Sequence, residues 1–372
     1  RAEDADFAAA AESGAAAALR GRRDILLTGA TGFLGPFLLR ELLLQSMPQV
    51  PGEVDPPKVF CVVRAKTDGE ALERLRREAV KLQTWEESFG EHVEALAGDV
   101  ALPRMGLSID KYTEVAFRVA HVVHNAARVH GVLPYRHLSP TNVGGSLEAL
   151  QLAALGRPKS LHHVSSINVL RPADDHPESS LPTAEGPAAA RLRGALDAMP
   201  GYAQSKAVAE VLLEQAAALL RGQRGGACVH PLARFCVYRL ATVSAHPRTG
   251  CGNVRCFTTD VIRGLAMLRA YPESGGQGLL PRSFLLTPVS FVTEALAALA
   301  LHGGAGPPEA ADACGDAEVF HLVTPHPTPW ADVLRHLAGS GLALRPVSQA
   351  EWTGLVASLP PENPLVLFRE AL

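Results

Sequence analysis

A tyrosine and a lysine stand four residues apart in the segment GYAQSKAVAE. Tyr202 and Lys206 lie in a stretch with helical periodicity, so this spacing places both side chains on one side of a helix. A phenol is a useful acid near neutral pH only when its anion is stabilised, and a neighbouring ammonium supplies that stabilisation. The pair therefore predicts proton donation to a substrate oxygen.

Two serines end an apolar run upstream of this pair, in the segment LHHVSSINV. A hydroxyl of Ser165 or Ser166 at this point is suited to holding a substrate carbonyl oxygen. Each serine taken alone is equally typical of a turn or a cap. The sequence between the serines and the Tyr-Lys pair, residues 171–200, is rich in Pro, Ala and acidic residues. We expect this excursion to leave the sheet and to cover part of the site.

Glycines at a spacing of three punctuate ILLTGATGFLGPFLLREL, between a predicted strand and a predicted helix. In this context Gly29 allows a tight turn, Gly32 lets the backbone approach a pyrophosphate, and Gly35 lets the helix pack closely on the strand. The N-terminus of that helix attracts phosphate charge. The pattern predicts a dinucleotide site formed by Thr28, Gly29, Thr31, Gly32, Phe33, Leu34 and Gly35.

The second predicted strand, VFCVVR, ends in Arg64 rather than in the acidic residue that binds the ribose 2′-hydroxyl of NAD. A guanidinium there suits a 2′-phosphate, and Arg74 adds charge, so NADPH is the predicted cofactor; the alternative is a solvated basic loop. Tyr202 and Lys206 are expected to reach its nicotinamide ribose. Further cofactor contacts are expected after the third and fourth strands, from Asp99, Val100, Asn125, Ala126 and Ala127.

Strands and helices alternate along most of the chain, which predicts an α/β fold. We expect a Rossmann-like, doubly wound parallel sheet over residues 24–250 and a smaller, mainly helical C-terminal substrate lobe over residues 251–372. Strands are expected within residues 25–27, 59–64, 93–100, 119–127, 161–169 and 235–244, and helices within 36–44, 68–83, 141–154 and 202–220.

Composition excludes several other classes of protein. The 372 residues carry 35 Lys and Arg against 38 Asp and Glu, so no strong field points to nucleic acid or anionic lipid. Apolar runs are too short for a membrane span. Six cysteines without a Cys-x-x-Cys pair favour a reduced, cytoplasmic protein.

The start at Arg1 and the Ala-rich residues 1–23, a linker or helix, suggest a piece of a longer polypeptide. His121 and His124 have odd strand spacing and face opposite sides, so no metal is expected.

These residues together resemble the extended short-chain dehydrogenase/reductase family, and within it the thioester reductase domains that terminate nonribosomal peptide and polyketide synthases. The likeness rests on LLTGATGFLG, VFCVVRA, GDV, VVHNAA, NVGGSLEALQLA, HHVSSINV, GYAQSKAVAE, HPRTGCGN and the tail VFHLVTPHPTPWADVL. It implies Ser166, Tyr202 and Lys206 as the catalytic triad and Asn142 as a structural residue beside it. Many relatives have Pro-Gly after Arg239 and Asp in place of Ser290, so these two positions depart from the pattern.

The resemblance implies NADPH-dependent reductive release of an acyl or peptidyl thioester, giving an aldehyde and, with a second hydride, an alcohol. The implied partner is a carrier domain bearing a phosphopantetheine thioester, within a multidomain synthase. Residues 171–200 are then expected to form part of a lid or carrier-facing wall beside the active site. An acyl-CoA or carboxylic acid reductase differs only in its acyl donor. A sugar-nucleotide epimerase or dehydratase would retain NAD and favour an acid at position 64. A non-catalytic NADPH-sensing module would not need the triad.

Overall fold

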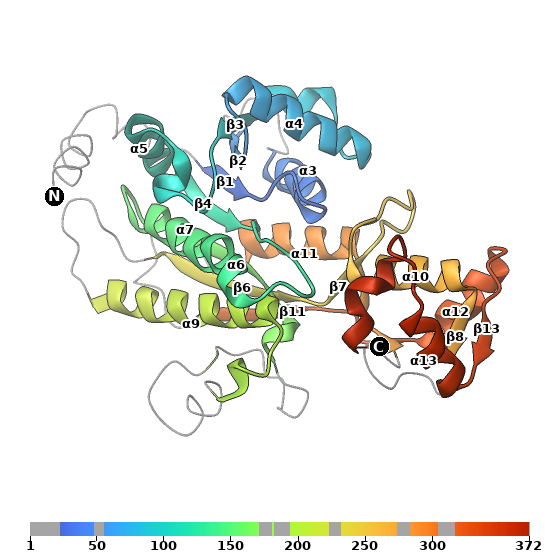
Figure 1. Cartoon of the computed structure of the whole chain (residues 1–372). Helices are drawn as coiled ribbons and strands as arrows, with labels where there is room; N and C mark the ends of the chain where they lie inside the picture. The colour runs from blue at the N-terminus through green and yellow to red at the C-terminus, as the bar shows by residue number, and fades with distance from the viewer. Residues whose placement is uncertain are drawn as a thin grey trace. The chain divides into compact units, whose positions relative to one another are not determined.

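A seven-stranded parallel sheet is the main feature of the computed structural model, which describes residues 23–47, 56–170, 181, 194–222, 232–273, 283–303 and 317–371 (Figure 1). The strand order is β11-β6-β5-β4-β1-β2-β3. The strands are β1 (Asp24–Thr28), β2 (Val59–Val63), β3 (Val93–Ala97), β4 (Val119–His124), β5 (Ser160–Ser166), β6 (Arg234–Leu240) and β11 (Glu318–Leu322).

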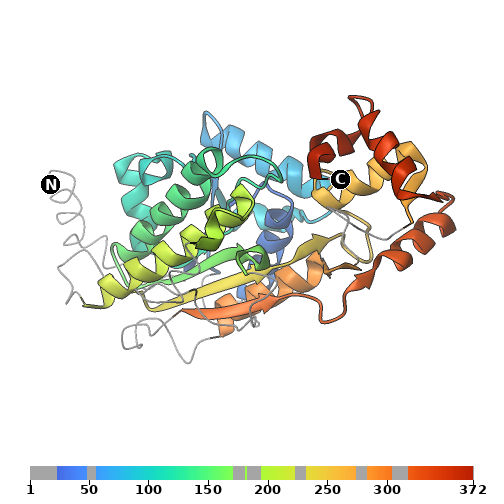
Figure 2. The ribbon, with the colours of Figure 1, turned by 60° about the horizontal axis from the view of Figure 1, so that its bottom comes forward.

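Helices cover both faces of this sheet, as Figure 2 shows. Every residue of β1 and β2 is buried, which is typical of strands covered on both sides. Apolar side chains of α5, α7 and α9 share one core with β4, β5 and β6, whereas α3 and α11 pack against each other on the other face. The helices are α3 (Leu34–Ser46), α4 (Asp68–Lys81), α5 (Ile109–Arg118), α6 (Tyr135–Ser139), α7 (Gly145–Ala154), α9 (Gly201–Gly222) and α11 (Val289–His302).

The strand order reverses between β1 and β4. After β3 the chain returns to the centre of the sheet, where β4 pairs with β1 in parallel and Thr28 lies opposite His124. Ligands of doubly wound sheets bind outside the carboxyl ends of the strands at such a switch point. The loops after β1 and β4 therefore define where a cofactor site is expected.

The chain forms two compact units whose boundaries differ from the expected division at residue 250. The first unit comprises residues up to Leu240 together with Val289–Leu322, and the second comprises Ala241–Pro288 and Val323–Leu372. The segment EVFHL was expected in the C-terminal lobe, but it forms β11 and pairs with β6 at the edge of the main sheet. The chain therefore leaves the first unit about ten residues earlier than predicted and returns to it once.

The second unit has short strands and its own core of aromatic and aliphatic side chains. The ring centroids of Trp330 and Phe284 lie 5.4 Å apart, and Trp352 is buried in the same cluster. Within the described ranges, no helix is both long and apolar enough to cross a bilayer. The unit contains β7 (Thr242–Ser244), α10 (Phe257–Leu268), β8 (Ala270–Pro272), β9 (Ser283–Phe284), β10 (Leu286–Pro288), β12 (Thr328–Pro329), α12 (Trp330–Gly339), β13 (Arg345–Val347) and α13 (Gln349–Ala357).

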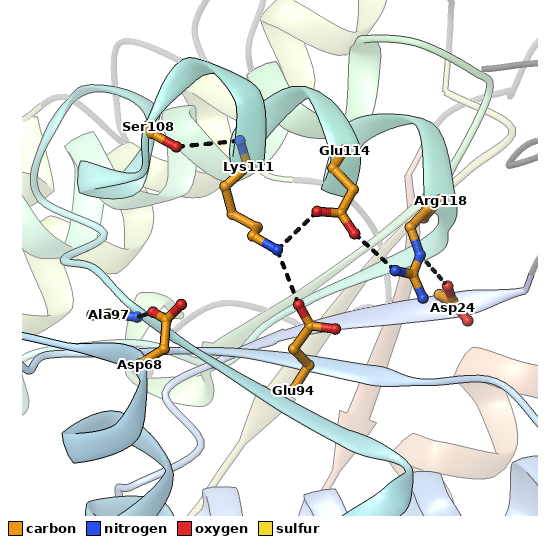
Figure 3. Close-up of polar contacts among 8 residues, drawn as sticks. All are labelled: Asp24, Asp68, Glu94, Ala97, Ser108, Lys111, Glu114 and Arg118. Carbon is orange, nitrogen blue, oxygen red and sulfur yellow. Dashed lines mark hydrogen bonds and ion pairs between the residues drawn. The ribbon is translucent and has the colours of Figure 1, made fainter. Parts of the chain in front are cut away.

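A polar cluster fastens α5 to the amino ends of the strands, as Figure 3 shows. Lys111 bonds both Glu94 and Glu114, at 3.1 and 2.8 Å. Arg118 bridges Glu114 and the fully buried Asp24, at 2.8 and 2.9 Å. This cluster lies at the edge of the sheet opposite the switch-point loops, so it stabilises the fold rather than forming part of the site.

Candidate active site

The glycine-rich turn between β1 and α3 has the geometry that the sequence predicts. Gly29 has φ +73°, and a Cβ placed there would lie 2.7 Å from the backbone nitrogen of Ala126. A Cβ on Gly35 would collide with the backbone of Gly29 and Ala30. The tight turn and the close helix packing therefore both require glycine.

The start of α3 offers backbone donors toward the same turn. A Cβ on the exposed Gly32 would meet only the Gly29 carbonyl oxygen, at 3.4 Å, so space is open at this point. The N-cap Phe33 makes no side-chain capping bond, and no acidic residue lies in the first turn of α3. Uncapped N–H groups with the helix dipole favour an anion, so this region fits the pyrophosphate of a dinucleotide. Thr31 and Leu34 lie in the same turn, each partly exposed.

Several residues of the predicted cofactor set form hydrogen bonds within the protein. Thr28 is fully buried, and its hydroxyl bonds His124 Nδ1 and the Ala126 N–H, at 2.9 and 3.1 Å. Asn125 Nδ2 donates to the Gly29 carbonyl at 3.2 Å. These bonds tie the glycine-rich turn to the loop after β4, which continues through the partly exposed Ala127.

The loops after β2 and β3 place the remaining predicted cofactor residues. Arg64 is exposed at the end of β2, and Arg74 Nη1 donates to the Arg64 carbonyl at 2.7 Å, so two guanidinium groups belong to this corner. Asp99 accepts a bond from the Ala101 N–H at 3.0 Å and so shapes its own turn. Val100 is buried against the start of α7.

Tyr202 and Lys206 lie in the first turns of α9, as the spacing predicts. Lys206 is buried, and its Nζ donates to the Val164 carbonyl of β5 at 2.8 Å. Burial lowers the pKa of Lys206 to about 8, although Glu210 acts in the opposite direction. Tyr202 is partly exposed, and desolvation raises the pKa of its phenol to about 12. The phenol is therefore protonated at neutral pH, and the expected lowering of its pKa by the ammonium is not seen here.

The two serines at the end of β5 have different partners. Ser165 donates its hydroxyl to the Glu210 carboxylate. Ser166 accepts a 3.2 Å bond from the Asn168 N–H and caps a short 3-10 turn, Ile167–Val169. Accepting this bond leaves the Ser166 proton available to a substrate oxygen. The cap and the catalytic interpretations of Ser166 are therefore compatible.

Asn142 connects the loop after β4 to α9. It lies in a π-helical segment, Pro140–Gly144, a local widening that is common at functional sites. Its side-chain oxygen accepts from the Arg128 N–H at 2.7 Å, and its nitrogen donates to Ser205 Oγ at 2.9 Å. Ser205 in turn donates to the Tyr202 carbonyl at 2.8 Å. Asn142 and Ser205 thus link the segment at Arg128 to the first turn of α9.

Sequence reasoning missed a buried ion pair behind this helix. Arg239 of β6 bonds the Glu210 carboxylate of α9, and both side chains are almost completely buried. The signal in the sequence is one charge within the apolar run FCVYRLA and one carboxylate a helical turn after Lys206. Most of the predicted lid, residues 171–200, lies outside the described residues; at its end, the Leu196 carbonyl accepts a 2.6 Å bond from Gln204.

The histidines of the central strands stack in pairs on opposite faces of the sheet. His121 stacks on His162 and His124 on His163, each at 5.7 Å between ring centroids. Burial lowers the pKa of His124 to about 3, with a further contribution from Lys206, so this ring is neutral. The part of the chain that the structure describes holds no group of three or more His, Cys, Asp or Glu arranged for a metal ion.

The chain matches known reductases in sequence over most of its length. An NAD-binding family model described as "Male sterility protein" matches residues 27–296. The chain is 32% identical over 343 residues to glycine betaine reductase ATRR of Emericella nidulans, covering 90% of this chain and 24% of that protein. It is 29% identical to a linear gramicidin synthase polypeptide of Brevibacillus parabrevis, covering 88% of this chain and 6% of that protein. The chain thus spans a quarter or less of these curated relatives.

A solved structure agrees with the fold over most of the chain. The terminal R domain from the myxalamid PKS-NRPS biosynthetic pathway superposes with a TM-score of 0.73 at 29% identity. The match covers 94% of this chain and 77% of that domain. The Rossmann-like fold expected from the sequence is therefore confirmed, together with its similarity to terminal reductase domains.

Proposed function

Because the chain belongs to the male sterility protein family of NAD-binding domains, we propose that it reduces a carrier-bound thioester with NADPH. The substrate is an acyl or peptidyl chain on the phosphopantetheine arm of a carrier domain, and the product is an aldehyde. A second reduction of the aldehyde would give an alcohol. Similarity to an R domain of a PKS-NRPS pathway and to a gramicidin synthase supports a carrier domain as the partner, in the cytoplasm.

One observation carries this proposal: Lys206 of α9 donates a hydrogen bond to the backbone of β5, two residues before Ser166. The same helix carries Tyr202, which is partly exposed. This fastening draws the hydroxyl-bearing end of β5 and the first turns of α9 together. A protonated phenol and a serine hydroxyl are the donors that a carbonyl oxygen needs as it gains negative charge.

In this proposal Tyr202 and Ser166 bind the substrate oxygen, and Tyr202 supplies the proton that the oxygen takes up. The bound nicotinamide supplies a hydride to the thioester carbonyl carbon. Tyr202 and Ser166 donate hydrogen bonds to the carbonyl oxygen, and Tyr202 gives it a proton to form a hemithioacetal. Loss of the hemithioacetal proton and cleavage of its C–S bond then give the aldehyde and the free thiol. One thioester, one NADPH and one proton are consumed, and one aldehyde, one thiol and one NADP⁺ are formed.

The test is the Tyr202→Phe variant, assayed with an acyl pantetheine thioester and an acyl-loaded carrier. Loss of the phenol proton is expected to lower NADPH oxidation about a hundredfold or more, while NADPH still binds. Product analysis by mass spectrometry identifies the aldehyde or alcohol. Tyr271→Phe, in the second unit, is the matched control and is expected to keep wild-type turnover. A Tyr202→Phe enzyme that reduces thioesters at near wild-type rate would exclude this mechanism.

A further inference from the structure

A carboxylate on the catalytic helix is buried between two strands of the sheet. Arg239 Nη2 of β6 lies 2.8 Å from Glu210 Oε2, and Arg239 Nε lies 3.3 and 3.2 Å from the two carboxylate oxygens. Ser165 of β5 also donates to Glu210. Arg239 has no exposed side-chain surface, and Glu210 has 4%. The carboxylate is therefore held by partners from both β5 and β6.

The position of this carboxylate relates it to the catalytic lysine. Tyr202, Lys206 and Glu210 are spaced by four along α9, so they lie on one face of the helix. Lys206 bonds the carbonyl of Val164, and Glu210 bonds the hydroxyl of the next residue, Ser165. Two successive residues of β5 thus fasten two successive turns of α9, directly before Ser166.

A buried ion pair is a poor device for stability alone, because desolvation of two charges offsets much of their attraction. Well-packed apolar side chains of similar volume would hold α9 on the sheet at least as well. The presence of charge at this position therefore calls for an electrostatic or geometric role beyond packing.

Among the described residues, the titratable groups that interact electrostatically with Lys206 come from three elements. From β5 and β4, His163 and His124 face the ammonium, and burial lowers the pKa of both rings so that they are neutral. From α9 itself, Glu210 raises the pKa of Lys206 against the larger, lowering effect of burial, which leaves it about 8. The negative charge that acts on Lys206 is therefore that of Glu210.

We propose that Glu210, held by Arg239 and Ser165, is a positioning residue of this site that fixes Lys206 on β5 and keeps its ammonium charged. The charged form matters because it binds the cofactor ribose and supports the Tyr202 phenolate as the proton leaves. Only this consequence for turnover rests on the proposed function; the effect on Lys206 itself does not.

The direct test follows the titration of Lys206 by NMR in cofactor-free protein. The chain has six lysines, so ¹³C labelling of lysine side chains gives a small set of signals, and Lys206→Arg assigns the relevant one. Glu210→Gln keeps the size of the side chain and removes its charge. We expect the Lys206 midpoint to fall by about one pH unit, because an opposite charge nearby favours the charged form. Glu214→Gln, one turn further along α9, is the control and should leave the midpoint unchanged.

A second variant keeps the test decisive if Glu210→Gln does not fold. Such a failure would arise because Glu210→Gln leaves Arg239 buried beside a neutral amide. Glu210→Leu with Arg239→Met replaces the whole pair by apolar side chains, a change that is often tolerated. It should lower the Lys206 midpoint in the same direction but by less, because removal of the Arg239 cation acts in the opposite direction. An unchanged midpoint in folded Glu210→Gln protein would overturn the proposal. If Glu210→Gln does not fold, an unchanged or raised midpoint in the double variant would overturn it.

Turnover gives the second readout. The alkaline limb of the pH-rate profile for NADPH oxidation should move to lower pH in Glu210→Gln, with little change in the rate at acidic pH, where Lys206 is protonated in both enzymes. A uniform loss of rate at all pH values would indicate a merely structural role. The NMR titration needs no substrate. An inactive wild-type enzyme would therefore contradict the proposed function and would leave the inference about Glu210 unaffected.

Discussion

Removal of the guanidinium groups at the end of β2 tests the choice between NADPH and NADH. Arg64 is exposed at the position where a 2′-phosphate is bound in folds of this kind, and Arg74 Nη1 lies 2.7 Å from its carbonyl oxygen. Arg64→Met keeps much of the side-chain length and removes the charge. Arg74→Met removes both a second cation and the contact to the Arg64 backbone.

The expected magnitude follows from the number and the exposure of these contacts. A hydrogen bond to a charged group contributes about 1.5–3 kcal/mol, which corresponds to a factor of about 10 to 150 in affinity. Because Arg64 is exposed, screening by solvent and salt places each single variant near the lower end of that range. NADH carries no 2′-phosphate, so its affinity should change little.

Calorimetric titration of each variant with NADPH and with NADH measures this difference. Arg77→Met is the matched control, because Arg77 lies on the same helix as Arg74, has a 68% exposed side chain and pairs with its neighbour Glu78 at 3.6 Å. The control should bind both cofactors as the wild type does. The assignment is refuted if the wild type binds NADH as tightly as NADPH, or if Arg64→Met weakens both cofactors equally.

Three further substitutions test the turn, the serine and the fold. Gly29→Ala should weaken NADPH binding at least about tenfold, because a Cβ at φ +73° costs about 1–2 kcal/mol and meets the loop after β4; unchanged affinity in calorimetry would contradict this. Ser166→Ala should lower thioester turnover less than Tyr202→Phe does, whereas Ser166→Thr should be tolerated, because it retains the hydroxyl; steady-state kinetics decide this, and an inactive but folded Thr variant would oppose it. Arg118→Met removes the ion pair that Arg118 makes with the fully buried Asp24, which still accepts a bond from the Lys58 N–H. It should cost about 1–3 kcal/mol of unfolding free energy, measured with urea, against less than about 1 kcal/mol for the exposed pair of Arg76.

Features with local physical causes were predictable from the sequence. The turn at Gly29 needs a positive φ, which restricts the residue type, and the Tyr202-Lys206 pair depends only on helical spacing. Continuous β-branched runs indicated the buried central strands. The first strand, the helix after it and α9 therefore lie where the sequence places them.

Features that depend on long-range pairing were not predictable in the same way. Residues Glu318–Leu322 are typical of a strand, but nothing in their periodicity shows that they pair with Arg234–Leu240. Glu210 is an ordinary helix residue and Arg239 is a charge within an apolar strand, and only the fold shows that they meet. A charge within an apolar run thus indicates a buried partner without identifying it.

The two adjacent serines at the end of β5 differ in their hydrogen-bond partners. Ser165 lies on the side of β5 that α9 covers, where Glu210 accepts its hydroxyl. Ser166 stands at the point where β5 ends and a turn begins, with its oxygen already satisfied by the Asn168 N–H. The first serine therefore contacts α9, whereas the second uses its oxygen in a cap and keeps a hydroxyl hydrogen that can be donated to a substrate oxygen, as the proposed function requires.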